Sequence, residues 1–153
     1  MREKHQREGF LARLVRRLRR PEMPDHLRAG LWGERIAERE LRRKGYRILG
    51  RRIRFGPREE LDLVANDGKD LVFIEVKTRA SEDFGRPVDA VSPDKQRLLV
   101  RAAWGYLRRM GKRRPDYIRF DVVEVIGREE DGAPKVHHIE NAFSPGPELR
   151  LPW

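Results

Sequence analysis

The sequence predicts a single α/β domain of the α+β kind, in which two helices flank a mixed β-sheet in the order αβββαββ. Two segments with a helical apolar stripe alternate with five short apolar strands, and glycine- or proline-containing turns separate them. A chain of 153 residues with 38% hydrophobic content is long enough to bury one core. We expect the domain over residues 28–143, after a basic arm and linker over 1–27 and before a tail over 144–153.

The first helix is expected over residues 28–44. Gly45 suits the position after a helix, and the basic residues 42–44 suit the negative end of the helix dipole. Three strands follow, over 46–55, 60–65 and 70–79. The Asp67-Gly68 pair between the last two is typical of a tight hairpin, with these two residues forming the loop.

The second helix is expected over residues 92–110. Ser92 is its N-cap, Pro93 its first residue and Gly111 the residue after its end. Two more strands, over 117–126 and 135–140, surround a turn at 130–132. The two helices lie either on opposite faces of the sheet or both on one face.

The charge of the chain indicates its partner. Lys and Arg number 35 against 25 Asp and Glu, which gives a formal net charge of +10 and favours nucleic acid as the partner. Of the nucleic acids, we expect DNA before RNA. The chain shows no apolar run that could cross a membrane and no signal peptide, and it has no cysteine. We therefore expect a cytoplasmic protein that does not bind membranes, and a homodimer is left open.

The first 20 residues hold eight basic and two acidic side chains. Apolar residues recur among them at helical spacing, which predicts a short basic amphipathic helix. This arm either grips phosphates, lies on a membrane surface, or is a solubilising extension that packs on its own domain. In the first case, the phosphate-binding residues are Arg13, Arg16, Arg17, Arg19 and Arg20.

The strand over 70–79 carries Glu75 and Lys77 on the same face as Phe73. Buried charges need partners, so the two either form a structural ion pair or face a ligand. The expected hairpin register pairs Asp62 with Phe73 and Glu60 with Glu75, which gathers three carboxylates and Lys77 on one face. A register shift of one residue would scatter them.

Glu34 falls inside the apolar stripe of the first helix. The small residues Gly30, Gly33 and Ala37 would let that helix approach the sheet closely enough for Glu34 to reach it. The alternative is that Glu34 extends from the edge of the stripe to water.

Glu34, Asp62, Glu75 and Lys77 together predict a catalytic site. The three carboxylates would bind Mg²⁺ or Mn²⁺, with the Val76 carbonyl as a further ligand. The Lys77 ammonium would orient a water molecule or stabilise charge on a phosphoryl oxygen. The predicted chemistry is metal-assisted hydrolysis of phosphodiesters.

A wider set of motifs extends along the chain. It consists of Gly33-Glu34, Ala37, Leu41, 45–49, 60–65, 72–79, Phe84-Gly85, Pro87, Ala90-Val91, Lys95 and 119–123. Together these segments resemble the bacterial YraN family. The resemblance covers residues 28–143 and implies a restriction-endonuclease-like fold, similar to Holliday-junction resolvases, with a PD-(D/E)xK site at Glu34, Asp62, Glu75 and Lys77 acting on branched or structured DNA. Two positions depart from the family pattern: Glu59 replaces a usual glycine and Arg52 a usual asparagine.

Several other residues keep two interpretations. Lys95 and Arg97 either contact phosphate from the rim of the site or form a solvated helix end. Asp121 is expected to be an ion-pair partner, and His137 and His138 point to opposite faces of a strand, which is unsuited to joint metal binding. The aromatic residues Trp32, Trp104 and Tyr106 either stack on bases or belong to the core.

Two rival functions stay open beside the nuclease. One is a nucleic-acid-binding module that does not cleave. The other is a basic interaction protein in which Glu75 and Lys77 form a structural ion pair.

Overall fold

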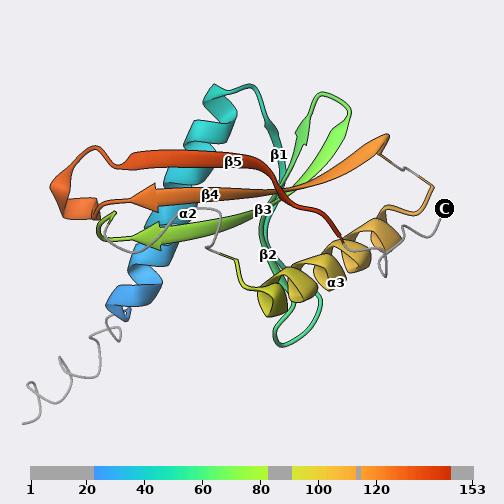
Figure 1. The fold of residues 1–153 in the computed structure, drawn as a ribbon, viewed down its shortest axis with the longest axis horizontal. Helices are drawn as coiled ribbons and strands as arrows, with labels where there is room; N and C mark the ends of the chain where they lie inside the picture. Colours follow the sequence, from blue (N-terminus) through green and yellow to red (C-terminus); the bar gives the residue numbers. More distant parts are fainter. Residues whose placement is uncertain (1–22, 83–90, 113–114, 146–153) are drawn as a thin grey trace, which may run out of the picture.

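The structure, a computed structural model, describes residues 23–82, 91–112 and 115–145. Its five strands form one mixed sheet in the order β1-β2-β3-β4-β5, in which β3 and β4 are parallel and the other neighbours antiparallel (Figure 1). The predicted α+β fold is confirmed and is consistent with the restriction-endonuclease-like class. The elements are α2 (Asp25–Arg43), β1 (Arg47–Arg54), β2 (Glu60–Asp67), β3 (Asp70–Arg79), α3 (Pro93–Met110), β4 (Tyr117–Ile126), the 3-10 turn η2 (Glu129–Asp131) and β5 (Lys135–Phe143).

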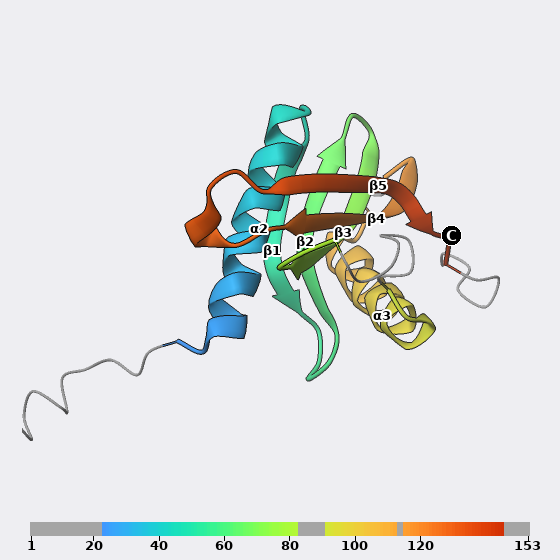
Figure 2. The same ribbon diagram turned by 60° about the vertical axis from the view of Figure 1, so that its left-hand side comes forward.

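One helix covers each face of the sheet (Figure 2). Trp32, Ala37 and Leu41 of α2 are buried against strand residues that include Val72 and Ile74. On the opposite face, α3 packs over a cluster centred on Phe73 and Phe120. Because side chains alternate along β3 and β4, each of these strands contributes residues to two separate hydrophobic cores, one on each face of the sheet. Within the described residues, neither helix is long and apolar enough to cross a membrane.

The ends of α3 agree with the sequence prediction. The Ser92 hydroxyl accepts a hydrogen bond from the backbone N–H of Lys95 at 3.3 Å, and Gly111 follows the helix with φ of +61°. Helix α2 begins at Asp25, three residues before the predicted start. The reason is Pro24, whose carbonyl accepts the N–H groups of Leu27 and Arg28, so that this proline starts the helix.

The β2–β3 hairpin uses a different loop from the predicted one. Asp67 pairs with Asp70, which leaves Gly68 and Lys69 as the loop. A glycine with positive φ at the first loop position, here +59°, is typical of a type II′ turn. The predicted register was therefore wrong by two residues, and Val64, in place of Asp62, lies opposite Phe73. Because the shift is even, every side chain keeps its predicted face.

Both edge strands are irregular. The pairing of β1 with β2 shifts between Ile48 and Gly50, and Arg52 has a φ of +47°. The pairing of β4 with β5 shifts between Phe120 and Val122, and Asn141 has a φ of +50°. Strand β5 continues through this bulge to Phe143, past the predicted end at residue 140.

Candidate active site

Asp62 and Glu75 meet where the β2–β3 ladder ends. The last backbone pair is Leu63 with Ile74. Beyond it, Oδ2 of Asp62 accepts a hydrogen bond from the backbone N–H of Val76 at 2.8 Å. The side chain of Asp62 thus replaces the backbone as the link between the strands, and this holds its carboxylate beside the Glu75–Lys77 segment.

Glu75 is buried between two lysines. Its side chain is 3% exposed, Oε1 lies 2.8 Å from Nζ of Lys77, and Oε2 lies 3.2 Å from Nζ of Lys95 at the start of α3. The Lys95 contact is an ion pair whose alignment is not that of a hydrogen bond, so Oε2 is a buried oxygen without a hydrogen-bond donor. Lys77 and Lys95 are each about one third exposed, which places this carboxylate just beneath the surface.

The electrostatic state of Asp62 follows from its surroundings. Burial first, and then the negative charge of Glu75, raise the pKa of Asp62 to about 7. The hydrogen bond from Val76 and the charge of Lys95 act in the opposite direction. Asp62 and Glu75 thus place two carboxylates in a poorly solvated space beside the ammonium groups of Lys77 and Lys95, an arrangement in which a cation would compete with the two lysines.

Glu34 approaches from the other helix. An added Cβ on Gly33 would lie 1.9 Å from Oγ1 of Thr78, so the missing side chain lets α2 press against β3. Gly30 does not contribute to this approach, because an added Cβ there would meet nothing within 4 Å. Glu34 lies 3.8 Å from Nε of Arg52. Burial raises the pKa of Glu34, Arg52 lowers it, and Glu60 and Glu75 raise it, so Glu34 is within electrostatic reach of the site.

The three predicted metal ligands do not form one compact set. Among the described residues, no three acidic or histidine side chains are close enough together to hold one ion. The pair Asp62 and Glu75 fits a hard cation, because it offers two neighbouring carboxylates, that of Asp62 partly buried and that of Glu75 buried with one oxygen that has no hydrogen-bond donor. The role of Glu34 as a third ligand stays a prediction.

Other predicted site residues lie nearby or elsewhere. Glu60 is held by Arg52 at 3.3 Å and Arg54 at 2.7 Å, and the register does not place it opposite Glu75. Arg97 is turned to Asp94 of its own helix, whereas Lys95 faces Glu75. The predicted phosphate-binding residues Arg13, Arg16, Arg17, Arg19 and Arg20 lie outside the described residues.

Comparison with known proteins identifies the family. The model of the uncharacterised protein family UPF0102 matches residues 33–125. The chain belongs to the UPF0102 family. The UPF0102 protein of Syntrophomonas wolfei is 48% identical over 116 residues, which are 74% of this chain and 96% of that protein. The UPF0102 protein of Symbiobacterium thermophilum is 47% identical over 116 residues, 76% of this chain and 96% of that protein. The resemblance predicted from the motifs is confirmed.

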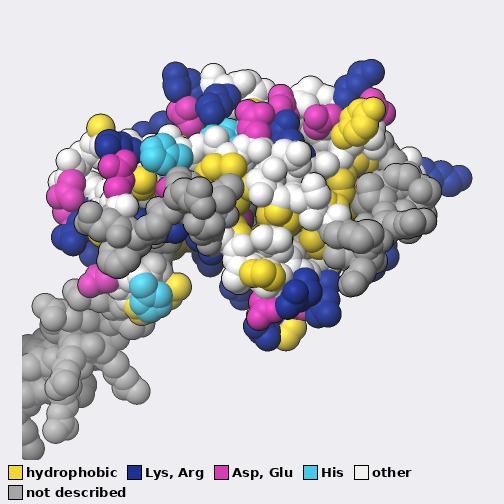
Figure 3. Space-filling model, viewed as in Figure 1, with side chains coloured by type: hydrophobic (Ala, Val, Ile, Leu, Met, Phe, Trp, Pro, Cys, Tyr) yellow, Lys and Arg dark blue, Asp and Glu magenta, His cyan; other side chains and the backbone are white. Residues whose placement is uncertain are grey.

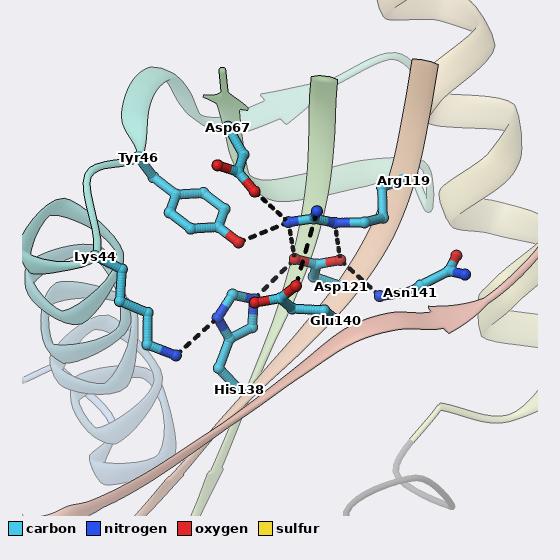
Figure 4. Close-up of polar contacts among 8 residues, drawn as sticks. All are labelled: Lys44, Tyr46, Asp67, Arg119, Asp121, His138, Glu140 and Asn141. Atoms are coloured by element: carbon cyan, nitrogen blue, oxygen red, sulfur yellow. Dashed lines mark hydrogen bonds and ion pairs between the residues drawn. The ribbon is translucent and has the colours of Figure 1, made fainter. Parts of the chain in front are cut away.

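This UPF0102 chain has a second polar cluster, on the α2 face of the sheet (Figure 4). Its centre is Asp121, which is fully buried and accepts hydrogen bonds from Arg119 at 2.9 and 3.1 Å. The buried ring of His138 contacts Asp121 through Nε2 at 2.8 Å and Lys44 through Nδ1 at 3.2 Å. The backbone N–H of Asn141 donates to Asp121 at 2.9 Å, which satisfies the donor that the β5 bulge frees from the ladder.

The charges of this cluster balance. Burial acts to raise the pKa of Asp121, but hydrogen bonds from His138, Arg119 and Asn141 hold it below its ordinary value. Burial raises the pKa of Tyr46, whose hydroxyl lies 2.6 Å from Arg119, to about 12. Each buried charge has partners, so we assign a structural role to the cluster, in agreement with the ion pair predicted for Asp121. His137 points to the other face, as expected, where it lies 3.5 Å from Glu124.

Proposed function

We propose that this protein is a metal-dependent nuclease that hydrolyses phosphodiester bonds, with branched or structured DNA as its expected substrate. The observation that carries the proposal is the buried carboxylate of Glu75, placed beside Asp62 and between two lysines, with one oxygen that no donor satisfies. A buried carboxylate oxygen without a hydrogen-bond donor, beside a second carboxylate whose pKa is raised, is typical of a functional site.

Each residue has a role in the proposed reaction. Asp62 and Glu75 would hold the cation, and Glu34 would complete its surroundings or hold a second ion. Mg²⁺ or Mn²⁺ would supply a more acidic water molecule and polarise a phosphoryl oxygen. Lys77 donates hydrogen bonds toward the attacking water and the negative charge that builds on the phosphoryl group. The water oxygen forms a bond to phosphorus and gives up a proton to solvent, the bond from phosphorus to the leaving sugar oxygen breaks, and that oxygen takes up a proton from solvent.

Lys95 has a positioning role in this proposal. Its ammonium holds the second oxygen of Glu75, which fixes the rotamer of that side chain while Lys77 holds the first. Lys95 is about one third exposed, so a substrate phosphate at the rim of the site can also reach its ammonium, which is one of the two interpretations that the sequence left open.

The test is a cleavage assay on a substrate panel. Purified protein is incubated with Mg²⁺ or Mn²⁺ on duplex, flapped, branched and single-stranded DNA, and on RNA of matched sequence. We expect cleavage that stops on chelation and is lost in Asp62→Asn. Glu129→Gln, which alters an exposed carboxylate paired with Arg35, is the matched control and should cut like the wild type. If no substrate is cut, the proposed function is wrong; if metal-dependent cutting survives in Asp62→Asn, the assignment of the reaction to this site is wrong.

A further inference from the structure

The outer face of α3 carries a stripe of positive charge. Arg97, Arg101 and Arg108 recur at spacings of four and seven on the exposed side of the helix, and Trp104 lies beside them at the edge of the core, against which it packs. Arg97 pairs with Asp94. Arg101 and Arg108 are exposed and have no ion-pair partner among the residues that the structure describes. Their charge is available to an anionic partner.

A hollow of about 460 Å³ lies between this stripe and the β1–β2 turn. It is lined by Phe55, Glu59, Arg101, Trp104 and Arg108. The lower edge of Figure 3, where Figure 1 draws this turn, carries Lys and Arg side chains beside hydrophobic ones. The hollow thus combines two aromatic rings with two guanidinium groups that are available to a ligand.

The geometry of the turn holds Phe55 in place. An added Cβ on Gly105 would lie 2.4 Å from Cδ1 of Phe55, so the ring lies directly on the bare helix backbone. The guanidinium of Arg109 lies over the same ring, 4.2 Å from its centroid. Phe55 is therefore a fixed wall, whereas Trp104 is partly exposed and opens onto the hollow.

The hollow lies within reach of the candidate active site. Trp104 is nine residues along α3 from Lys95, which is about 14 Å at the helical rise. Glu59 is three residues along the chain from Asp62, which is about 10 Å in extended form. At about 3.4 Å per nucleotide of a stacked strand, these distances correspond to about three or four nucleotides.

We propose that this hollow binds an unpaired nucleobase of a nucleic-acid strand that passes through the active site. Bases of a duplex are stacked against one another, so only an unpaired base presents its face to the partly exposed Trp104, beside the wall that Phe55 forms under Arg109. Arg101 and Arg108 hold the flanking phosphates, and the Glu59 carboxylate accepts a hydrogen bond from an exocyclic amino group. The inference rests on the proposed nuclease function for the presence of a nucleic acid, and it specifies the substrate: DNA with a single-stranded segment beside the cut.

The test measures binding without cleavage. Fluorescence anisotropy in chelator-containing buffer compares a blunt duplex with the same duplex carrying a short single-stranded segment. We expect wild type to bind the second at least about tenfold more tightly, and Trp104→Leu, which keeps an apolar side chain, to lose most of this preference. Tyr117→Leu removes an aromatic ring that is 73% exposed at the start of β4 and should keep the preference. A folded Trp104→Leu variant with the full preference overturns the inference.

A second measurement uses the unchanged protein. Photocrosslinking from 5-bromouracil in the unpaired segment should attach to the peptide that contains Trp104 or Phe55, and attachment elsewhere only would contradict the inference. The two proposals fail separately. If the protein prefers the duplex with the single-stranded segment and crosslinks at the hollow but cuts no substrate, the nuclease proposal is refuted and the base-binding hollow is supported. If the protein cuts DNA equally well with and without Trp104 and shows no preference for the single-stranded segment, the hollow is refuted and the nuclease proposal is supported.

Discussion

The ammonium of Lys77 lies 2.8 Å from Oε1 of Glu75, two residues earlier on the same face of β3. A structural ion pair and a catalytic lysine would both produce this contact. The second ammonium, that of Lys95, allows the two interpretations to be separated, because Glu75 keeps a partner when Lys77 is replaced.

Lys77→Met should reduce cleavage much more than stability. Lys95 still pairs with Glu75, so the fold should be destabilised by about 1–2 kcal/mol, below the ~3–5 kcal/mol of a buried charge left alone. Single-turnover cleavage should fall by roughly 10²–10³. Lys95→Met is the matched control for the ion pair, and the double variant should show the full destabilisation in urea unfolding. If Lys77→Met alone shows that full destabilisation and wild type does not cut, the pair is structural.

Asp62→Asn should leave the metal-free protein as stable as wild type or more stable, by about 0.5–2 kcal/mol, because it removes the charge of a partly buried carboxylate whose pKa is raised by burial and by Glu75. Divalent cation should raise the melting temperature of wild type and not that of the variant. Asp116→Asn, the same change at an exposed residue paired with Lys69, should keep the response to metal. A metal-free Asp62→Asn protein that melts far below wild type would mean that Asp62 stabilises the fold.

Gly33→Ala should destabilise the protein by about 1–3 kcal/mol, because its Cβ would collide with Thr78 and push α2 away from β3. The shift would also move Glu34 and reduce cleavage. Gly30→Ala on the same helix has free space and should be neutral or stabilising by up to about 1 kcal/mol. Thermal melts of the two variants compare the sites, and equal effects would contradict the close approach at Gly33.

The Asp121 cluster should make the fold acid-sensitive. Since the pKa of Asp121 is lowered in the folded state, its stabilisation is complete above its ordinary value near 3.9 and is lost as the pH falls through the lowered pKa. Asp121→Asn should therefore cost about 3–5 kcal/mol at pH 7, where it leaves Arg119 buried without its main partner, and less at acidic pH. Urea unfolding of both proteins across pH 3–7 measures the difference, and an NMR titration of the Asp121 carboxyl in wild type checks the direction of the shift. A difference independent of pH would contradict this account.

Deleting residues 1–20 should weaken DNA binding about equally across sequences. If the arm binds phosphates, the slope of log K against log salt should flatten by about 0.9 for each phosphate of duplex DNA that the arm neutralises in the full-length protein. Filter binding at several salt concentrations provides the slope. An unchanged slope would leave the arm as a spacer or as an extension that solubilises the chain.

The sequence predicted the elements whose signals are local. Ser92 and Gly111 delimit α3, and the alternation along β3 and β4 gives both strands with their observed bounds, because capping and side-chain period depend only on neighbouring residues. The hairpin register was wrong because Asp67-Gly68 and Gly68-Lys69 are both acceptable loops for a glycine with positive φ. The error left the candidate site intact because the shift was even.

Contacts between segments that lie far apart in the sequence could not be predicted from local residue patterns. The approach of Lys95 to Glu75 depends on how α3 lies across the sheet, and local patterns offered only a cation near a helix start. Arg119, Asp121 and His138 come together because β4 pairs with β5 through a bulge, which no residue pattern in the sequence marked. Arg52 is a partial exception: its φ of +47° gives a backbone reason for the asparagine usual at that position in the resembling family, since asparagine tolerates this conformation better than arginine does.

The bulges in β1 and β5 affect how copies of this chain can associate. Among the described residues these strands form the two edges of the sheet, and an edge with a regular row of unpaired N–H and C=O groups is a template for another strand. The shift at Ile48–Gly50, the arginines of β1 and the turn of backbone at Asn141 interrupt that row on both sides. We therefore expect little edge-to-edge aggregation, and we expect any homodimer of this protein to form through its helices or loops and not by extending the sheet.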